Sequence, residues 1–195
     1  MLKKFVLGGM TALVLAACGG EGGSASSSAP AQSANASGSL IERINNKGTI
    51  TVGTEGTYAP FTYHDKDGKL TGYDVEVTRA VADKLGVKVE FKETQWDSMM
   101  AGLKAGRFDV VANQVGLTSP ERQATFDKSE PYSWSGAVLV ARKDSNIKSI
   151  DDIKGVKTAQ SLTSNYGEKA KAAGAELVPV DGLAQSLTLI EQKRA

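Results

Sequence analysis

Cysteine and histidine are almost missing from this sequence. Its 195 residues include one cysteine, Cys18, and one histidine, His64. A single cysteine excludes an internal disulfide and a cysteine-based zinc site, and a single histidine excludes a histidine cluster of the kind that binds transition metals. We therefore expect neither a metal nor a cofactor.

Charge of one sign is also lacking, because 23 Lys and Arg residues balance 22 Asp and Glu residues. A net charge of +1 gives no reason to expect a polyanionic partner, and no basic stripe is interleaved with the few aromatic residues. We therefore predict no nucleic-acid partner. With 41% hydrophobic and 23% charged residues the chain is not disordered throughout, and its length suits one domain or two small ones.

The apolar run at the start of the chain is too short to cross a bilayer, which takes about 20 residues. In MLKKFVLGGMTALVLAA, two lysines precede a charge-free run from residue 5 to residue 17. A basic start followed by a short apolar stretch is typical of a secretory signal. We predict a signal peptide over residues 1–17.

The cysteine comes directly after that stretch. Leu15-Ala16-Ala17-Cys18 resembles the bacterial lipobox, in which small residues fit a lipoprotein signal peptidase and the cysteine thiol is diacylated. The resemblance implies that Cys18 is a lipid anchor and that the protein is exported, facing the periplasm or the cell surface. A buried cysteine that falls there by chance is the alternative.

Large apolar side chains are absent from residues 19–39, where 17 of 21 residues are Gly, Ser or Ala. Such a segment cannot bury enough surface to offset its ordering entropy, so residues 18–39 are predicted to be a lipidated, flexible tether. The part that folds would be residues 40–195. Its charges balance as well, because only Lys3, Lys4 and Glu21 precede it.

The folded part begins with alternating strand and helix signals. Strands are predicted near residues 50–53, 87–91 and 108–112, the last buried on both faces. Asp74 is predicted to be the N-cap of the first intervening helix and Gly86 its C-cap, and Asp97 precedes the second helix. The strand-helix order predicts a doubly wound α/β unit. The inward faces are expected to carry Val77, Val81 and Leu85 in the first helix and Met99, Met100 and Leu103 in the second.

A hairpin is predicted between the first strand and the first helix. Asp65-Lys66-Asp67-Gly68 separates two short strand signals, and an Asp-Gly pair supplies the positive-φ turn that hairpins prefer. Calcium binding is the alternative for the two aspartates, but the sequence lacks a third loop ligand and a terminal Glu. His64 lies beside this turn without an evident partner in the sequence.

A second round of strand and helix signals follows. Strands are predicted at 137–141, 156–159 and 176–180, and helices at 149–153, from Ser164 or Asn165 to 173, and at 184–194. In the last helix, Leu187 and Ile190 are expected to face inward.

Four motifs identify a resemblance when they are taken together. GTEGTYAPF at 53–61, GYDVE at 72–76, QWD at 95–97 and TSPER at 118–122 resemble, in order and spacing, the family 3 bacterial solute-binding proteins. These are receptors of polar amino-acid ABC importers. The resemblance implies a type II periplasmic binding protein-like α/β fold, with one lobe at 40–132, a hinge at 133–136 and a partial second lobe at 137–195.

The resemblance also implies which residues bind an amino acid between the lobes. Arg122 matches the carboxylate-binding arginine, and a planar guanidinium suits that task. Glu55 matches an acidic residue that helps to hold the ammonium, while Tyr58 and Trp96 match two aromatic residues that sandwich the aliphatic part. The alternatives are an Arg122 paired with Glu121 or Asp127, an exposed Glu55 and two core aromatics.

Further contacts are expected from two loops. After the strand at 108–112, relatives offer backbone groups and a hydroxyl to the ligand carboxylate, which points to Asn113, Gly116 and Thr118. This sequence departs from the pattern, because Gly116 replaces the usual Thr or Ser and Ser119 looks inserted. In the second lobe, Thr163 and Ser164 stand where a loop enters a helix, a suitable site for an anion. Alternatively, they only cap that helix.

We therefore expect a monomeric, lipid-anchored receptor that delivers a polar amino acid to an ABC permease, with closure at the hinge. Asn113-Gln114-Val115 is most similar to the cystine-binding branch. The second lobe looks C-terminally truncated, lacking the later strand from which relatives supply an aspartate, so weak binding or incomplete folding is expected. A dehydratase of the same fold and an amino-acid sensor are the alternatives, although no nucleophile-base pair, membrane helix or output domain is evident.

Overall fold

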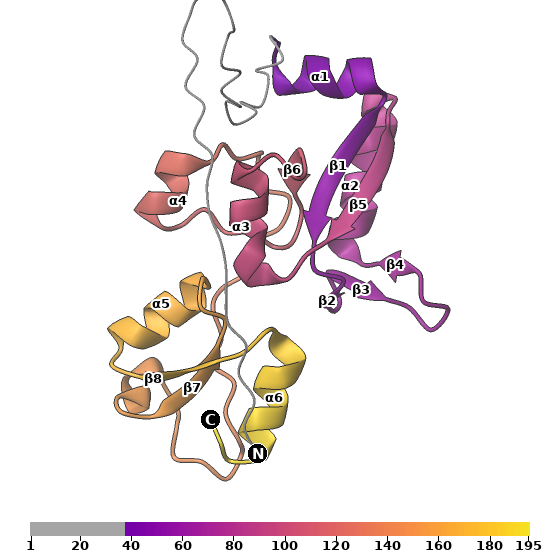
Figure 1. The fold of residues 1–195 in the computed structure, drawn as a ribbon. Helices are drawn as coiled ribbons and strands as arrows, with labels where there is room; N and C mark the ends of the chain where they lie inside the picture. Colours follow the sequence, from indigo (N-terminus) through magenta and orange to yellow (C-terminus); the bar gives the residue numbers. More distant parts are fainter. Residues whose placement is uncertain (1–37) are drawn as a thin grey trace, which may run out of the picture. The chain divides into compact units, whose positions relative to one another are not determined.

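The computed structural model describes residues 38–195. Figure 1 draws this part of the chain as a coloured ribbon. The predicted signal peptide, Cys18 and most of the tether lie outside the described residues. The first element is helix α1 (Leu40–Lys47), which the sequence reading did not predict. A capping box starts it, since the Ser39 hydroxyl accepts from Glu42 N and the Glu42 side chain accepts from Ser39 N.

A three-stranded parallel sheet forms the centre of the first lobe, the name used here for residues 40–132. Its strands are β1 (Thr49–Thr54), β5 (Lys88–Glu93) and β6 (Val110–Val111), in the order β5-β1-β6. Helices α2 (Tyr73–Leu85) and α3 (Trp96–Lys104) connect them. The predicted β-α-β-α-β unit is confirmed, and its central strand β1 is the most buried one. The prediction that the strand at 108–112 is buried on both faces is wrong, because β6 lies at the edge of this sheet and its two residues are only half-buried.

The core lies on both faces of β1, because alternate side chains of a strand point to opposite faces. On one face, Ile50 and Val52 pack with Ile44 of α1 and Ala82 of α2. On the other, a Cβ at Gly53 would lie 2.7 Å from the ring of Phe108. Glycine is therefore required where this aromatic ring contacts the strand.

Two details of α2 differ from the prediction. Its N-cap is Gly72, and Asp74 lies within the helix, where its carboxylate accepts from the main chain and side chain of Gln114. The buried face carries Val75, Thr78 and Ala82, whereas Val81 and Leu85 are exposed. The prediction followed the apolar residues alone, but buried polar residues share the inward face. In α3, Met99 is fully buried as expected.

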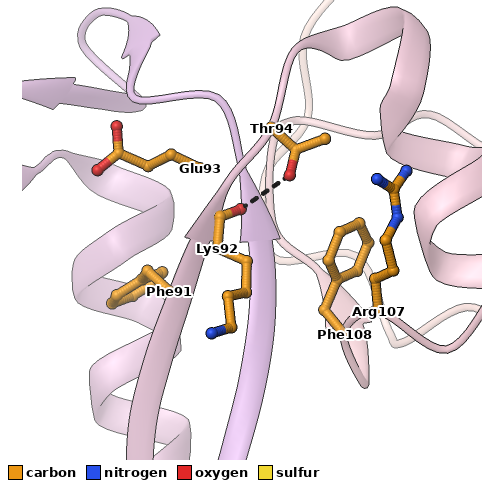
Figure 2. A pocket seen from close by; sticks show the side chains of 6 residues that line it. All are labelled: Phe91, Lys92, Glu93, Thr94, Arg107 and Phe108. Atoms are coloured by element: carbon orange, nitrogen blue, oxygen red, sulfur yellow. Dashed lines mark hydrogen bonds between the residues drawn. The ribbon is translucent and has the colours of Figure 1, made fainter.

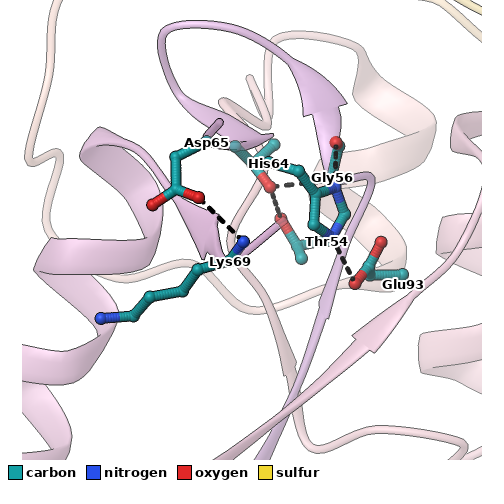
Figure 3. A network of polar contacts seen from close by, with 7 residues as sticks. Thr54, Gly56, His64, Asp65, Lys69 and Glu93 are labelled. Carbon is teal, nitrogen blue, oxygen red and sulfur yellow. Dashed lines mark hydrogen bonds and ion pairs between the residues drawn. The ribbon is translucent and has the colours of Figure 1, made fainter. Parts of the chain in front are cut away.

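The predicted hairpin is confirmed by β3 (Thr62–His64) and β4 (Leu70–Thr71), which pair antiparallel. Strand β3 also pairs antiparallel with β2 (Thr57–Tyr58). Gly68 has a φ of 75°, and Asp65 Oδ1 accepts from the backbone N–H groups of Asp67 and Lys69. His64 has two partners that the sequence did not indicate. Figure 3 shows its ring between the Gly56 carbonyl and the Glu93 carboxylate, both at 3.2 Å.

The second lobe, residues 137–195, contains a two-stranded parallel sheet of β7 (Lys157–Gln160) and β8 (Glu176–Pro179). The 3₁₀ helix η1 (Ile150–Ile153) precedes β7, α5 (Asn165–Ala172) connects the strands, and α6 (Leu183–Glu191) follows β8. These elements confirm five of the predicted ones. In α6, however, Leu189 is the buried residue, Ile190 is half-buried and Leu187 is exposed.

The strand predicted at 137–141 is wrong. This segment has no regular secondary structure, and Val138 is 85% exposed. A strand needs a neighbour for its backbone N–H and C=O groups, and none pairs with this segment among the described residues. The apolar sequence indicated strand propensity but not the missing partner.

Between residues 38 and 195, no helix is both long and apolar enough to span a membrane. In the same range, no group of three or more His, Cys, Asp or Glu side chains is arranged to hold a metal ion.

Candidate functional site

The candidate site is built around Arg122, which a short helix brings into position. Helix α4 (Pro120–Thr125) begins after Ser119, whose hydroxyl accepts from Arg122 N at 3.3 Å. Serine is a preferred N-cap, and proline suits the first helical position because its φ is already helical. The Ser119 that looked inserted in the motif thus starts the helix and places Arg122 in its first turn.

The Arg122 side chain is 8% exposed and is held on three sides. Its Nη1 donates to the Gly116 carbonyl at 3.0 Å, and its Nη2 donates to the Thr163 carbonyl at 2.6 Å. The guanidinium also lies over the ring of Trp96, 5.4 Å from its centroid. Arg122 forms no salt bridge within residues 38–195, so pairing with Glu121 or Asp127 is not what the structure shows.

Glu55 lies directly after strand β1 and is half-buried rather than exposed. One of its oxygens accepts from Asn113 Nδ2 at 2.6 Å. Burial raises the pKa of the Glu55 carboxyl, while the bond from Asn113 and one from the Trp96 backbone N–H oppose that rise. A desolvated carboxylate with spare acceptor capacity is suited to a cation such as an ammonium group.

Asn113 is only 2% exposed, and its side chain is already occupied. Its Oδ1 accepts from Glu55 N at 2.8 Å and from Thr54 Oγ1 at 3.2 Å, while its amide nitrogen donates to Glu55. The Asn113 side chain therefore fixes the position of Glu55, whereas its predicted contact with a ligand stays a prediction.

The two aromatic residues have different surroundings. Trp96 begins α3 beneath Arg122, and its buried Nε1 finds no hydrogen-bond partner in the described part of the chain. Tyr58 ends β2 and packs against Phe61, with the ring centroids 5.2 Å apart. Burial raises the pKa of Tyr58, and the nearby Tyr166, Glu55 and Asp74 raise it further. Trp96 thus contacts Arg122, whereas the ring contact of Tyr58 is with Phe61.

Of the five residues predicted in the two loops, only Gly116 and Thr163 accept hydrogen bonds from Arg122. Gly116 offers its carbonyl to Arg122, while Thr118 makes no side-chain hydrogen bond within residues 38–195. The Ser164 hydroxyl caps α5 by accepting from Tyr166 N at 3.1 Å. Thr163 is placed among the site residues, through its carbonyl on Arg122. The structure therefore joins Glu55 to Asn113, and Arg122 to Trp96, Gly116 and Thr163.

The sequence reading missed two polar groups near this site. Asp97, which was read only as preceding a helix, accepts hydrogen bonds from Leu162 and Thr163. Asp74, which was read as an N-cap, is buried against Gln114. For Asp97, the QWD motif was the available signal, but a sequence does not show what a side chain meets in a distant loop.

A separate hollow of about 460 Å³ lies at the edge strand β5. Figure 2 shows Phe91, Lys92, Glu93 and Thr94 of that strand and its end on one side, with Arg107 and Phe108 on the other. None of the predicted site residues lines it. The contacts of Arg122, rather than this hollow, bring together three other predicted residues, Trp96, Gly116 and Thr163.

Comparison with known proteins shows the family. Residues 50–188 match the bacterial extracellular solute-binding proteins, family 3. A probable amino-acid ABC transporter-binding protein of Haemophilus influenzae is 62% identical over 159 residues, which are 81% of this chain and 62% of that protein. The L-cystine-binding protein TcyA of Bacillus subtilis is 60% identical, over 80% of this chain and 59% of its own length.

Solved structures agree on the fold. The L-cystine solute receptor of Neisseria gonorrhoeae, in an unliganded open conformation, is 96% identical and matches 82% of this chain and 67% of its own, with a TM-score of 0.50. The ancestral amino-acid-binding protein AncCDT-1, a precursor of cyclohexadienyl dehydratase, is 36% identical and matches 80% of this chain and 71% of its own, with a TM-score of 0.75. The present structure therefore differs more from the N. gonorrhoeae receptor than from AncCDT-1 in the placement of matched residues, although its sequence is nearly the same as that of the receptor.

The relatives are longer than the matched region. The chain spans about three fifths of the length of the two relatives from H. influenzae and B. subtilis. The similarity nevertheless includes all four motifs, since they lie between residues 53 and 122. The predicted periplasmic binding protein-like fold is confirmed, and the chain belongs to the bacterial extracellular solute-binding proteins, family 3.

Proposed function

We propose that this chain is the amino-acid-binding component of an ABC importer. One observation carries the proposal: Arg122 is a nearly buried cation whose partners within residues 38–195 are two carbonyls and an indole ring. Burying a charge without a counter-ion is unfavourable, so such a guanidinium is suited to an incoming anion. The α-carboxylate of an amino acid supplies a planar anion that a guanidinium binds with two parallel hydrogen bonds.

The other ends of an amino acid find matching groups nearby. Glu55 is an acceptor for the ammonium, and its partner Asn113 fixes its position. Trp96 offers an apolar surface and a buried N–H that has no partner between residues 38 and 195, which suits a ligand that carries both aliphatic and polar atoms. A cation, an anion and an apolar surface match the carboxylate, the ammonium and the side chain of an amino acid.

L-cystine is the proposed ligand. Support comes from two relatives that are named for binding it, the L-cystine-binding protein TcyA of B. subtilis and the L-cystine solute receptor of N. gonorrhoeae. After capture, the protein would pass the ligand to a permease in the membrane. We further propose a monomer that is exported by the signal at residues 1–17 and anchored through lipid on Cys18, with a hinge at residues 133–136.

Binding without turnover is part of the proposal. AncCDT-1 is described as a precursor of a dehydratase, so the fold by itself does not separate the two functions. The sole histidine is bonded to Gly56 and Glu93, away from the groups that contact Arg122. We expect no product from prephenate or arogenate with the purified protein. Product that disappears in Glu55→Gln would instead assign an enzyme.

Isothermal titration against a panel of amino acids tests the proposal. The full 195-residue chain is titrated with L-cystine, L-arginine, L-histidine and L-glutamine, under non-reducing conditions so that cystine stays intact. We expect saturable binding of L-cystine with a stoichiometry of one. Absence of heat with every amino acid in the panel would contradict an amino-acid-binding function, and preference for another member would reassign the ligand.

A further inference from the structure

The sole histidine makes contacts that amino-acid binding does not explain. His64 ends strand β3, and its ring lies between two groups of the first lobe (Figure 3). Its Nδ1 is 3.2 Å from the Gly56 carbonyl oxygen, and its Nε2 is 3.2 Å from Glu93 Oε1. The His64 and Glu93 side chains are 39% and 47% exposed, so their ion pair alone contributes little to stability. The contact with Gly56 therefore needs its own explanation.

Gly56 forms a tight turn directly after Glu55. Its φ of 73° lies in the left-handed region, which favours glycine, and a Cβ there would lie 3.1 Å from His64 Cε1. The Gly56 N–H donates to Thr62 Oγ1 at 3.1 Å, while the Gly56 carbonyl faces the His64 ring. Residues two apart in a strand face the same side, so Thr62 and His64 of β3 hold both polar groups of Gly56.

A buried polar network connects this turn to the Glu55 side chain. Thr62 Oγ1 is 2.8 Å from Thr54 Oγ1, which lies 3.2 Å from Asn113 Oδ1. Asn113 in turn accepts from Glu55 N and donates to the Glu55 carboxylate. Thr54, Thr62 and Asn113 are almost inaccessible to solvent. Buried hydrogen bonds are costly to leave unmade, so the position of the turn and that of Glu55 depend on each other.

The contact with Gly56 defines which nitrogen of His64 carries hydrogen. A carbonyl oxygen only accepts, so Nδ1 is the donor. The neutral tautomer with hydrogen on Nδ1 makes this bond, and the charged ring donates to Gly56 and Glu93 together. Both forms can therefore hold the Gly56 carbonyl.

We infer that His64 is a positioning residue, which holds the turn at Gly56 and thereby keeps Glu55 in place for the ligand ammonium. The inference rests on the proposed function in one respect, namely that Glu55 binds that ammonium. A carboxylate that is fixed before the ligand arrives loses less conformational entropy on binding, which favours affinity. The network lies within the first lobe, so it does not depend on where the second lobe lies. His64 would thus raise affinity without touching the ligand.

Hydrogen exchange by NMR in the ligand-free protein tests the network itself. Among the described residues, the N–H groups of Glu55 and Gly56, called here the turn amides, donate to side chains and to no backbone carbonyl. In His64→Leu, which keeps an apolar side chain but not the donor, the turn amides should exchange at least tenfold faster. Rates equal to those of the wild type would overturn the inference.

Two controls separate this effect from a general loosening of the hairpin. The Asp65 carboxylate holds the amides of Asp67 and Lys69, which should exchange at wild-type rates in His64→Leu. Lys69→Leu places the same side chain at an exposed position of the same hairpin and should leave the turn amides unchanged. Acceleration of the Asp67 and Lys69 amides in His64→Leu by the same factor as the turn amides would overturn the positioning role, because the whole hairpin would then have loosened.

Isothermal titration with L-cystine tests the consequence for binding. His64→Leu should weaken binding about fivefold, and Lys69→Leu should match the wild type. His64→Asn should keep most of the affinity, because its amide nitrogen can replace Nδ1 as the donor to Gly56. Asparagine is unfavourable in strands, so a role of His64 in strand stability alone would give no such rescue.

The outcomes of the titration distinguish the inference from the proposed function. Equal weakening in His64→Leu and His64→Asn would overturn the inference, because the bond to Gly56 would then not matter. If the wild type binds no amino acid, the proposed function fails, while the exchange experiment still decides whether His64 holds the turn.

Discussion

The two lobes contribute different kinds of groups to the candidate site. The first lobe supplies charged side chains, those of Glu55, Asp97 and Arg122, each fixed on or beside a regular element. The second lobe contributes main-chain groups of Leu162 and Thr163 and one hydroxyl. The choice of ligand should therefore depend on the side chains of the first lobe. The contribution of the second lobe should depend on the conformation of its backbone rather than on its side chains.

The strands of the first lobe are also more deeply buried than those of the second. In the first, strand β1 is buried along almost its whole length between two paired strands. In the second, β7 and β8 form a two-stranded sheet with mostly half-buried residues, and the apolar segment 137–141 is unpaired. Substitutions should consequently cost more stability in the first lobe.

Met99→Ala should give the largest loss in the free energy of unfolding. Met99 is 0% exposed in α3, and removing a buried side chain of this size typically costs about 2–5 kcal/mol. The apolar residue Val138 is the control, since Val138→Ala should change stability by no more than about 0.5 kcal/mol. Urea unfolding measures both, and similar losses would contradict the difference in packing.

Gly53→Ala should rank next. The added methyl would lie 2.7 Å from the Phe108 ring, so the ring or the strand must move, at a cost of about 1–3 kcal/mol. In the second lobe, Gly182→Ala is the matched change, because no atom lies within 4 Å of a Cβ there. The two unfolding midpoints should differ clearly, and a Gly53→Ala protein as stable as the wild type would show that the site has spare room.

The two serine caps should separate stability from binding. Ser164→Ala and Ser119→Ala each remove an N-cap, which costs about 1 kcal/mol. Only Ser119 bonds the backbone of Arg122, so only Ser119→Ala should also weaken binding of L-cystine, by a few fold. Weakening by Ser164→Ala beyond its effect on stability would assign the Ser164 hydroxyl to the ligand instead.

The smallest expected effects are on the pH dependence of stability. They come from Asp74 in the first lobe and Asp152 in the second, and they have opposite signs. Burial raises the pKa of Asp74 above its ordinary value of 3.8, so the stability from its protonated form is present at low pH and lost as pH rises through the raised value. Backbone N–H groups of Lys148 and Ser149 lower the pKa of Asp152, so its stability is present above the ordinary value and lost as pH falls.

Chemical unfolding between pH 3 and pH 7 measures these slopes. Relative to the wild type, Asp74→Asn should make stability rise more with pH, because it removes a group that opposes the rise. Asp152→Asn should make stability rise less. Slopes that both change in one direction would contradict the assigned surroundings of the two carboxyls.

Much of the first lobe could be predicted from the sequence because its signals are local. The turn glycine Gly68 and the cap at Gly86 depend on neighbouring residues only, and each is where it was expected. The errors have a non-local cause. Asp74 resembles a cap in sequence, yet its partner Gln114 is 40 residues away.

The candidate site divides in the same way. The family resemblance pointed to Arg122, Trp96 and Thr163, which the structure brings together. The contact of Asp97 with Thr163 joins residues 66 positions apart, and no local pattern records it. The strand expected at 137–141 failed for a related reason, since strand formation depends on a partner elsewhere.

Titration of L-cystine into variants of Arg122 and Arg79 tests the proposed contact of Arg122 with the ligand carboxylate, with Arg79 as the control. Arg122 and Arg79 each lie over an aromatic ring, at 5.4 Å and 5.3 Å, but only Arg122 is buried beside Thr163. Arg122→Ala should lose measurable binding, while Arg79→Ala should bind as the wild type does. Retained affinity in Arg122→Ala, or equal loss in both variants, would show that Arg122 does not bind the ligand carboxylate.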